Sequence, residues 1–258
     1  MPGPMTTRQR QNLWIVLAAF ALVLVATLEI GTEVHRGRPG DHPRQLHGDA
    51  GQFAVIPVTD HGVRAPTAAQ RANAEAGLAA MQRWLGAHGG AVVTRATDVL
   101  LTDHDHCPSS GQHPEAAGVT LNGKKICLFT ADTPELQVPT LLRQTAAHEA
   151  VHVLQGQLGC AAPLPSWLVE GMAEDLSWRT ILPHDDEATL ERWAAMEQGE
   201  QPADGLNYGT AMRAALDLDG GRPARLVDFC RAVGQGAPWR LAFSQTFDAS
   251  ADRYASRF

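Results

Sequence analysis

The stretch from residue 144 to residue 155 constrains the chain most, because it lacks glycine and proline up to its end and carries the pattern His-Glu-x-x-His. Residues four positions apart lie on one face of a helix, about one turn from each other, so the imidazoles of His148 and His152 project together. Two neutral imidazoles on one helix face are a common pair of zinc ligands. Glu149, between them, is placed to take a proton from a water molecule that the metal activates. We therefore predict a helix that supplies two metal ligands and a general base.

A second segment supplies the third ligand that a catalytic zinc requires. Eighteen residues after His152 comes Glu170, within the segment Trp-Leu-Val-Glu-Gly-Met-Ala-Glu of residues 167–174. Two histidines and one glutamate are a recognised catalytic set, which leaves the fourth position open for water. Glu174 lies one turn beyond Glu170 on the same face, where a carboxylate would accept the free N–H of a ligand histidine. We predict one zinc ion bound by His148, His152 and Glu170, with Glu174 orienting a ligand.

The two segments together resemble the gluzincin zinc metallopeptidases, the clan of thermolysin and the zinc aminopeptidases, and the smaller peptidase-MA-like family. In that clan the third ligand is the glutamate of a W-L-x-E-G-x-A segment, which corresponds to Glu170. A metzincin would need glycine at position 155 and histidine or aspartate at position 158, where this chain has Gln155 and Leu158. The resemblance covers roughly residues 95–258. It implies a compact α+β zincin fold, with a small mixed sheet and its helices followed by an all-helical second half.

The resemblance also implies a reaction and the residues that perform it. Zinc-activated water would hydrolyse a peptide bond in a peptide or protein substrate, with Glu149 as the general base. In the zinc aminopeptidases and the smaller relatives, a tyrosine at the start of a later helix stabilises the transition state. Tyr208, in Asn-Tyr-Gly-Thr-Ala-Met-Arg, is similar to that residue. His184 is the next candidate for the donor, and we expect Tyr254 to be silent.

Three alternatives remain open from the residues alone. The protein could be a zinc hydrolase of a non-peptide amide, a catalytically silent zinc-stabilised binding domain tethered to the membrane, or a tethered interaction module without metal. Glu149 argues against the silent version, because a structural zinc site closes its fourth position and has no use for a base. A net charge of −7 and the lack of a basic block make nucleic acid an unexpected partner.

The N-terminal part predicts attachment to a membrane. Polar residues 1–12 are followed by an uninterrupted apolar run of sixteen residues. This length lies between a signal-peptide core of about 7–15 residues and a spanning helix of about 17–25, and no suitable cleavage site follows. We expect a single-pass signal-anchor over residues 13–30, a flexible stalk over 31–52, and an extracytoplasmic metallopeptidase domain over 53–258 at the cell membrane. Secretion after signal-peptide cleavage is the alternative.

Four cysteines fit an exported domain that contains two disulfides. Three connectivities are possible. We favour Cys107–Cys127 and Cys160–Cys230, because each pair would tie a loop to a regular element. Four reduced, buried thiols in a cytosolic enzyme are the alternative, which the N-terminal segment disfavours.

Local patterns predict the remaining elements. The dipeptide Asn122-Gly123 indicates a hairpin over residues 118–129, just before the zinc helix. In gluzincins a strand at this place pairs with extended substrate, although a hairpin that only packs the core fits the sequence equally well. Residues 103–115, which include three histidines, are expected to form a surface loop rather than a second metal site. Short strands are expected over 91–93 and 98–101, and helices over 67–85, 186–196, 208–218, 224–233, 239–247 and 250–258.

Overall fold

The computed structural model describes residues 52–58, 63–107, 116–182, 189–190, 194–195 and 206–256. The predicted signal-anchor, almost all of the stalk, and His184 lie outside these residues, as does most of the helix predicted over 186–196. In the described part of the chain, no helix is long and apolar enough to cross a membrane.

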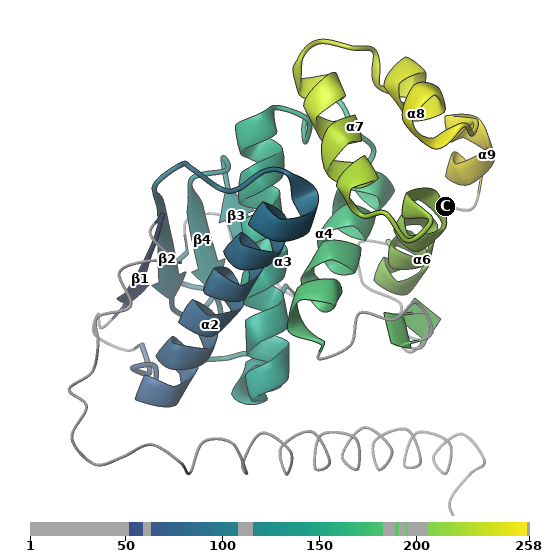
Figure 1. Ribbon diagram of the computed structural model, residues 1–258. Coiled ribbons are helices and arrows are strands. Elements are labelled where there is room, and N and C mark those ends of the chain that lie inside the picture. Colours follow the sequence, from purple (N-terminus) through teal and green to yellow (C-terminus); the bar gives the residue numbers. More distant parts are fainter. Residues whose placement is uncertain are drawn as a thin grey trace, which may run out of the picture. The chain divides into compact units, whose positions relative to one another are not determined.

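A four-stranded mixed sheet forms one layer of the fold (Figure 1). Its strands are β1 (Phe53–Pro57), β2 (Thr97–Leu101), β3 (Gly118–Leu121) and β4 (Lys125–Leu128). Strands β1, β2 and β4 are parallel, whereas β3 is antiparallel to β4. The spatial order is β1-β2-β4-β3, so β3 forms an edge of the sheet. The predicted hairpin is present, and both Asn122 and Gly123 adopt the positive φ angles that its turn requires, 52° and 60°.

Helices cover one face of this sheet and continue away from it (Figure 1). Helices α2 and α3 lie against the strands, α4 packs on α3, and α6 packs on α4. The α+β class, with a small mixed sheet followed by a helical second half, is therefore confirmed. The helices are α2 (Ala68–Trp84), α3 (Pro139–Leu158), α4 (Ser166–Ile181), α6 (Tyr208–Asp219), α7 (Ala224–Gly234), α8 (Trp239–Phe247) and α9 (Ala251–Ala255), with short turns η2 (Leu85–Gly89) and η4 (Pro134–Gln137).

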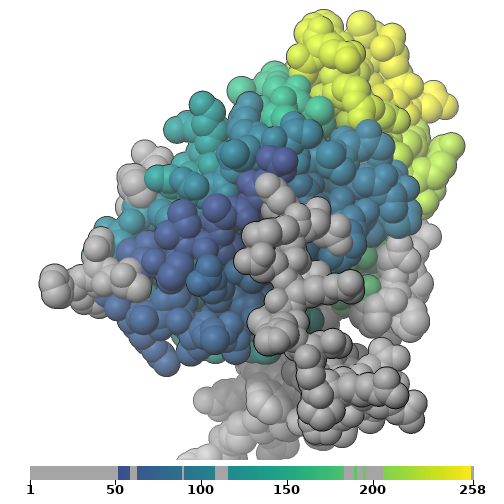
Figure 2. All heavy atoms as spheres, turned by 60° about the vertical axis from the view of Figure 1, so that its left-hand side comes forward, coloured from purple at the N-terminus to yellow at the C-terminus, as the bar shows by residue number. Residues whose placement is uncertain are grey.

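The surface view shows how the two halves of the chain divide the molecule (Figure 2). The early segments, coloured purple and blue and including β1 and α2, lie together, and the C-terminal helices, coloured yellow, lie together at one end. Helices α3 and α4, which carry the predicted metal ligands, lie between these two groups in the sequence. They also connect the groups in space, because α3 packs on α2 and the sheet and α4 packs on α6.

Local sequence explains where the two central helices begin and end. Helix α3 begins at Pro139, whose fixed φ and missing N–H suit a first helical turn. It ends at Gly159, which adopts a left-handed φ of 81° and lets the chain turn back. Helix α4 then starts directly after Pro165. The result is an antiparallel pair in which α3 extends beyond the run from residue 144 to residue 155.

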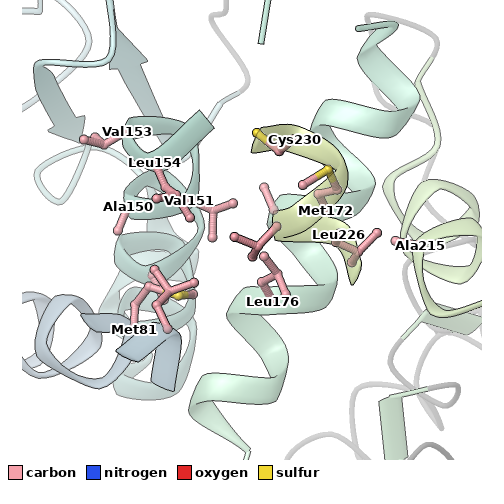
Figure 3. Close-up of a cluster of buried hydrophobic side chains, with 14 of the residues drawn as sticks. Met81, Ala150, Val151, Val153, Leu154, Met172, Leu176, Ala215, Leu226 and Cys230 are labelled. Atoms are coloured by element: carbon pink, nitrogen blue, oxygen red, sulfur yellow. The ribbon is translucent and has the colours of Figure 1, made fainter. Parts of the chain in front are cut away.

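An apolar core holds α3 and α4 together (Figure 3). Val151 and Leu154 of α3 and Met172 and Leu176 of α4 are all buried in it. Burying a side chain of this size stabilises the fold by about 1.5–3 kcal/mol. Because α3 is covered by the sheet on one side and by α4 on another, the predicted ligands lie on a rigid support.

Both predicted disulfides are confirmed. Cys107–Cys127 joins the segment after β2 to strand β4, and Cys160–Cys230 joins the α3–α4 connection to α7. The first disulfide lies in a small apolar cluster with Phe129, into which Val119 of β3 also packs. The face of the sheet opposite the helices is therefore secured by a covalent bond.

The strand predicted over residues 91–93 is wrong, because these residues form an irregular connection. The side chain of Gln82 replaces a partner strand there. Its Nε2 donates to the carbonyl of Val93 and its Oε1 accepts from the N–H of Val93, each at 2.8 Å. A side-chain amide thus satisfies both backbone groups that a strand would have paired.

Candidate metal centre

Three side chains from two helices converge on one point: His148 and His152 of α3 and Glu170 of α4. The Nε2 atoms of the histidines are 3.0 Å apart, and Glu170 Oε2 lies 3.2 Å from His148 Nε2 and 3.3 Å from His152 Nε2. In a tetrahedral zinc site with bonds of about 2.0–2.1 Å, ligand atoms are roughly 3.3 Å apart. The triangle matches three corners of such a site, so this group could hold a metal ion.

The orientation of His152 is set by Gln155, one turn further along α3. Gln155 Nε2 donates to the carbonyl of Val169 at 2.9 Å, so its Oε1 is the atom that faces His152 Nδ1, at 2.8 Å. Because an amide oxygen can only accept, Nδ1 carries the proton. In the neutral ring Nε2 then presents its lone pair to the centre of the triangle, as a metal ligand must.

His148 has a corresponding partner on α4. Its Nδ1 lies 2.9 Å from Glu174 Oε1, an ion-pair contact in which the ring N–H is not aligned as in a straight hydrogen bond. Glu174 is itself held in place, because Gln144 Nε2 donates to its other oxygen at 3.0 Å. Gln144 Nε2 also lies 3.0 Å from Ser177 Oγ. Glu174 therefore lies next to a ligand histidine, at the place expected for an orienting carboxylate.

These polar contacts form a series along the α3–α4 pair. Gln155, near the C-terminal end of α3, contacts Val169 near the start of α4. His148 and Gln144, which lie earlier in α3, contact Glu174, which lies later in α4. The polar contacts therefore match the antiparallel packing of the apolar core. The two ligand-bearing helices are joined on both sides of the triangle, which fixes the distances between its corners.

The charges at the centre favour a cation. Burial lowers the pKa of His148, but the carboxylates of Glu174 and Glu170 more than offset this effect and raise that pKa well above its ordinary value. Burial also opposes the charge on Glu170, yet His152 and His148 hold the pKa of Glu170 well below its usual range. The carboxylates thus stabilise positive charge at the imidazole nitrogens, and a divalent metal ion would supply such charge at the same point.

Glu149 is buried beside the triangle, with 4% of its surface exposed. Its Oε2 accepts a hydrogen bond from the hydroxyl of Thr120 at 2.6 Å. Thr120 belongs to β3, the edge strand. The sheet therefore contacts the predicted general base, whereas the two predicted ligand histidines are contacted by Gln155 of α3 and Glu174 of α4.

Helix α6 places Tyr208 near the same end of α4 as Glu170. A Cβ atom on Gly171 would lie only 2.3 Å from the carbonyl oxygen of Ala211, so the lack of a side chain at Gly171 permits this close packing. Arg179 of α4 pairs with Asp219 at the other end of α6, so the two helices run in the same direction. Tyr208 lies one turn before Ala211 and Glu170 directly before Gly171, which brings both to the first turns of the pair.

The histidines of the predicted surface loop have other partners. His104 Nδ1 lies 2.8 Å from Asp132 Oδ2 and its Nε2 lies 3.0 Å from the carbonyl of Ala116. His106 Nδ1 pairs with Asp103 at 2.6 Å. Neither histidine belongs to a group of metal ligands within the described ranges, which exclude His113.

Three residues that contact the predicted ones were not themselves predicted to do so: Gln144, Gln155 and Thr120. Gln155 could have been found, because it lies one turn beyond His152 on the same helix. Thr120 lies 29 residues before Glu149, and no local pattern marks it.

No protein-family model, curated protein or solved structure matches this chain.

Proposed function

We propose that this protein is a zinc metallopeptidase of the gluzincin type, with the compact zincin fold that the two sequence segments imply. The observation that carries the proposal is the triangle of His148, His152 and Glu170, which has the dimensions of a three-ligand zinc site, with a buried carboxylate, Glu149, next to it. A purely structural site would need a fourth protein ligand and no base.

The ligand set suits zinc among the common metals. Two imidazoles and one carboxylate are typical of catalytic zinc, whereas calcium and magnesium prefer oxygen ligands alone. When bound, the ion would lower the pKa of a coordinated water toward about 7 and polarise a substrate carbonyl. Gln155 and Glu174 keep the imidazole lone pairs directed at the ion: Gln155 Oε1 accepts a hydrogen bond from His152 Nδ1, and the carboxylate of Glu174 lies against His148 Nδ1.

Glu149 moves the proton in this reaction. Its carboxylate takes one proton from the attacking water, whose oxygen forms the new bond to the carbonyl carbon of the substrate. Glu149 then delivers the same proton to the amide nitrogen as the carbon–nitrogen bond breaks. The products are a carboxylic acid and an amine, and the carboxylate of Glu149 is regenerated.

Tyr208 is the proposed donor to the oxyanion that develops on the carbonyl oxygen. Two observations support this role: α6 begins at Tyr208, and its first turn lies beside the second turn of α4, which contains Glu170. The side chain of Asn207 caps this turn by accepting from the N–H of Thr210 at 2.7 Å. This cap fixes the backbone of the turn that carries the phenol of Tyr208.

The edge strand β3 supports a peptide as the substrate. An extended peptide can add to the edge of a sheet through backbone hydrogen bonds. Because the same strand contacts Glu149 through Thr120, a chain paired with β3 would lie close to the general base. A small non-peptide amide would make no use of such an edge.

We further propose that the domain functions outside the cytoplasm, anchored by residues 13–30. The two disulfides support an oxidising compartment, in which such bonds persist. Secretion after cleavage of a signal peptide would agree equally with the disulfides.

The test combines metal analysis with hydrolysis by the full-length chain. We expect about one zinc per chain, cleavage of a mixed peptide library, loss of cleavage on chelation, and recovery when zinc is restored. Protein that binds zinc but cleaves neither peptides nor small amides would be a binding domain. Cleavage of small amides alone would assign a non-peptide hydrolase.

A further inference from the structure

The side chain of Glu149 packs against strand β3. Gly118 and Thr120, two positions apart, share the face of the strand that meets α3, whereas Val119 and Leu121 pack into the disulfide cluster on the opposite face. The hydroxyl of Thr120 lies 2.6 Å from Glu149 Oε2 and 3.0 Å from the backbone carbonyl of Glu149. One residue of the strand thus contacts both ends of the glutamate.

The space beneath Glu149 is shaped by the lack of a side chain at Gly118. A Cβ atom there would lie 3.1 Å from Glu149 Cγ, and equally close to side-chain carbons of Leu128 and Thr145. These neighbours would have to shift to accept it. The aliphatic part of the Glu149 side chain therefore packs on the backbone of β3 at Gly118. Its carboxylate reaches the hydroxyl of Thr120, two residues further along the strand.

We propose that Thr120 is a positioning residue for Glu149: its hydroxyl holds Oε2, so that Oε1 is the oxygen that accepts the proton of the attacking water. This inference rests on the proposed function, in which Glu149 is the general base. Thr120 touches neither the substrate nor the metal ligands in this role, and it acts only through Glu149.

The chemistry of the contact suits this role. A glutamate has three rotatable side-chain bonds, and an unanchored carboxylate would sample several orientations. A hydroxyl that donates to a carboxylate at 2.6 Å forms a short, charge-assisted bond, which selects one of them. Threonine is also stiff at its first side-chain bond, because it is branched at Cβ. The donor is therefore as fixed as the strand that carries it.

The position of Thr120 on an edge strand adds a reason for this arrangement. The strand that we propose to receive the substrate also orients the base, so the scissile bond and the proton acceptor share one support. A displacement of about 1 Å between reacting groups can reduce the rate about 100-fold. Loss of the hydroxyl should therefore appear in turnover rather than in binding.

The experiment compares Thr120→Val and Thr120→Ser in the full-length, zinc-loaded protein. Valine keeps the shape of threonine without the hydroxyl, and serine keeps the hydroxyl. We expect Thr120→Val to lower kcat about 10–100-fold with KM and zinc content nearly unchanged, and Thr120→Ser to retain kcat within about threefold. The matched control is Thr97→Val on β2, which removes the bond from a buried hydroxyl to the carbonyl of Arg95 and should leave kcat unchanged.

The outcomes separate this inference from the proposed function. If Glu149→Gln is inactive and Thr120→Val keeps the kcat of the wild type, only the role of Thr120 is overturned. Equal losses in Thr120→Val and Thr120→Ser would also overturn it, because packing rather than the hydroxyl would then matter. If the wild type and Glu149→Gln hydrolyse substrate equally, or if neither hydrolyses any, the proposed function itself fails. Intact folding is verified by thermal unfolding of each variant.

Discussion

Helix α4 buries charge on two sides, and the two clusters differ in how that charge is neutralised. Toward α3, Glu170 and Glu174 meet two histidines. Toward α6, Asp175 and Arg179 meet Asp219, with Arg179 Nε 2.9 Å from Asp175 Oδ1 and Arg179 Nη2 2.7 Å from Asp219 Oδ2. All three residues on the α6 side are buried.

The cluster toward α6 contains its own permanent cation. A guanidinium stays protonated at any physiological pH, so Arg179 compensates one of the two carboxylates without an external ion. The second carboxyl group, that of Asp175, keeps its proton at neutral pH. Burial, together with the charge of Asp219, raises the pKa of Asp175 to about 8 despite the opposing effect of Arg179. This group of Asp175, Arg179 and Asp219 contains its own cation and needs no external ion, so we call it the closed cluster. It joins α4 to α6.

The cluster toward α3 contains histidines in place of an arginine. Their positive charge is conditional, because neutral imidazoles are metal ligands and protonated ones are not. Buried carboxylates alone therefore do not indicate a metal site, because those of Asp175 and Asp219 are paired with Arg179. What distinguishes the candidate metal centre is that His148, His152 and Glu170 each offer a ligand atom toward one point. The following predictions test this distinction, from the largest expected effect to the smallest.

The strongest test separates the ligands from the base. His152→Ala removes a corner of the triangle and should abolish zinc binding and hydrolysis together. Glu149→Gln should retain zinc and lose turnover about 100–10,000-fold, because only the proton acceptor is lost. Metal analysis and peptide hydrolysis on the same samples distinguish the two patterns. Retention of wild-type turnover in both variants would contradict the mechanism.

Tyr208 lies on the helix that the closed cluster connects to α4. Tyr208→Phe keeps the ring and the helix start, so stability and zinc content should hardly change. Loss of one oxyanion donor should lower kcat about 100–1,000-fold, with a smaller effect on KM. Tyr254→Phe, whose ring packs against Phe243 near the C-terminus, is the matched control and should be nearly silent. Should Tyr208→Phe keep its kcat, His184 is tested next, and a damaging Tyr254→Phe would reject the assignment of the helical half.

The closed cluster should matter for stability rather than for catalysis. Arg179→Met leaves the buried carboxylate of Asp219 without its cation and should lower the free energy of unfolding by about 3–5 kcal/mol. Arg71→Met is the control, because the pair of Arg71 with Glu75 is half exposed and should contribute less than about 1 kcal/mol. Denaturant unfolding measures both. Below its unfolding temperature, Arg179→Met should still bind one zinc, and a loss of zinc binding from the folded variant would show that the two clusters are coupled.

Glu174 and Asp175 are neighbours in the sequence but face different clusters. Glu174→Ala should weaken zinc affinity about 10–100-fold, because His148 loses the group that orients it. Asp175→Asn should leave that affinity unchanged. Competition with a chelator of known affinity measures both variants. Equal affinities for wild type and Glu174→Ala would assign Glu174 a packing role only.

The last prediction concerns the pH dependence of stability. The pKa of Asp175 rises from 3.8 to about 8 on folding, so the folded state retains a proton that the unfolded state loses. The contribution of Asp175 is fully present below pH 3.8 and is lost as the pH rises through about 8. Asp175→Asn mimics the protonated acid and should flatten this decline. Urea unfolding of the zinc-saturated protein at several pH values in that window measures it, and parallel curves for the two proteins would reject the assigned proton.

The sequence by itself predicted the residues that could hold a metal ion, and the helices that carry them. The spacing of His148 and His152 and the caps of α3 act within a few residues, so helix geometry makes them readable without a structure. Glu170 could be predicted because its segment is also continuous. The hairpin at Asn122-Gly123 depends on similarly local chemistry, whereas the Cys160–Cys230 disulfide joins residues 70 positions apart. The signal-anchor over residues 13–30 stays a prediction.

Only the tertiary structure decided what surrounds that chemistry. Strand β1 was not predicted, because its pairing of Phe53 with Thr97 joins segments far apart in the chain. Thr120 and Gly171 had no readable role, since one contacts Glu149 from a neighbouring strand and the other lets α6 approach α4. Such contacts follow from packing, which brings together residues that no period of a helix or strand relates. A local pattern can therefore name metal ligands, but the residues that orient them are set by the packing of distant segments.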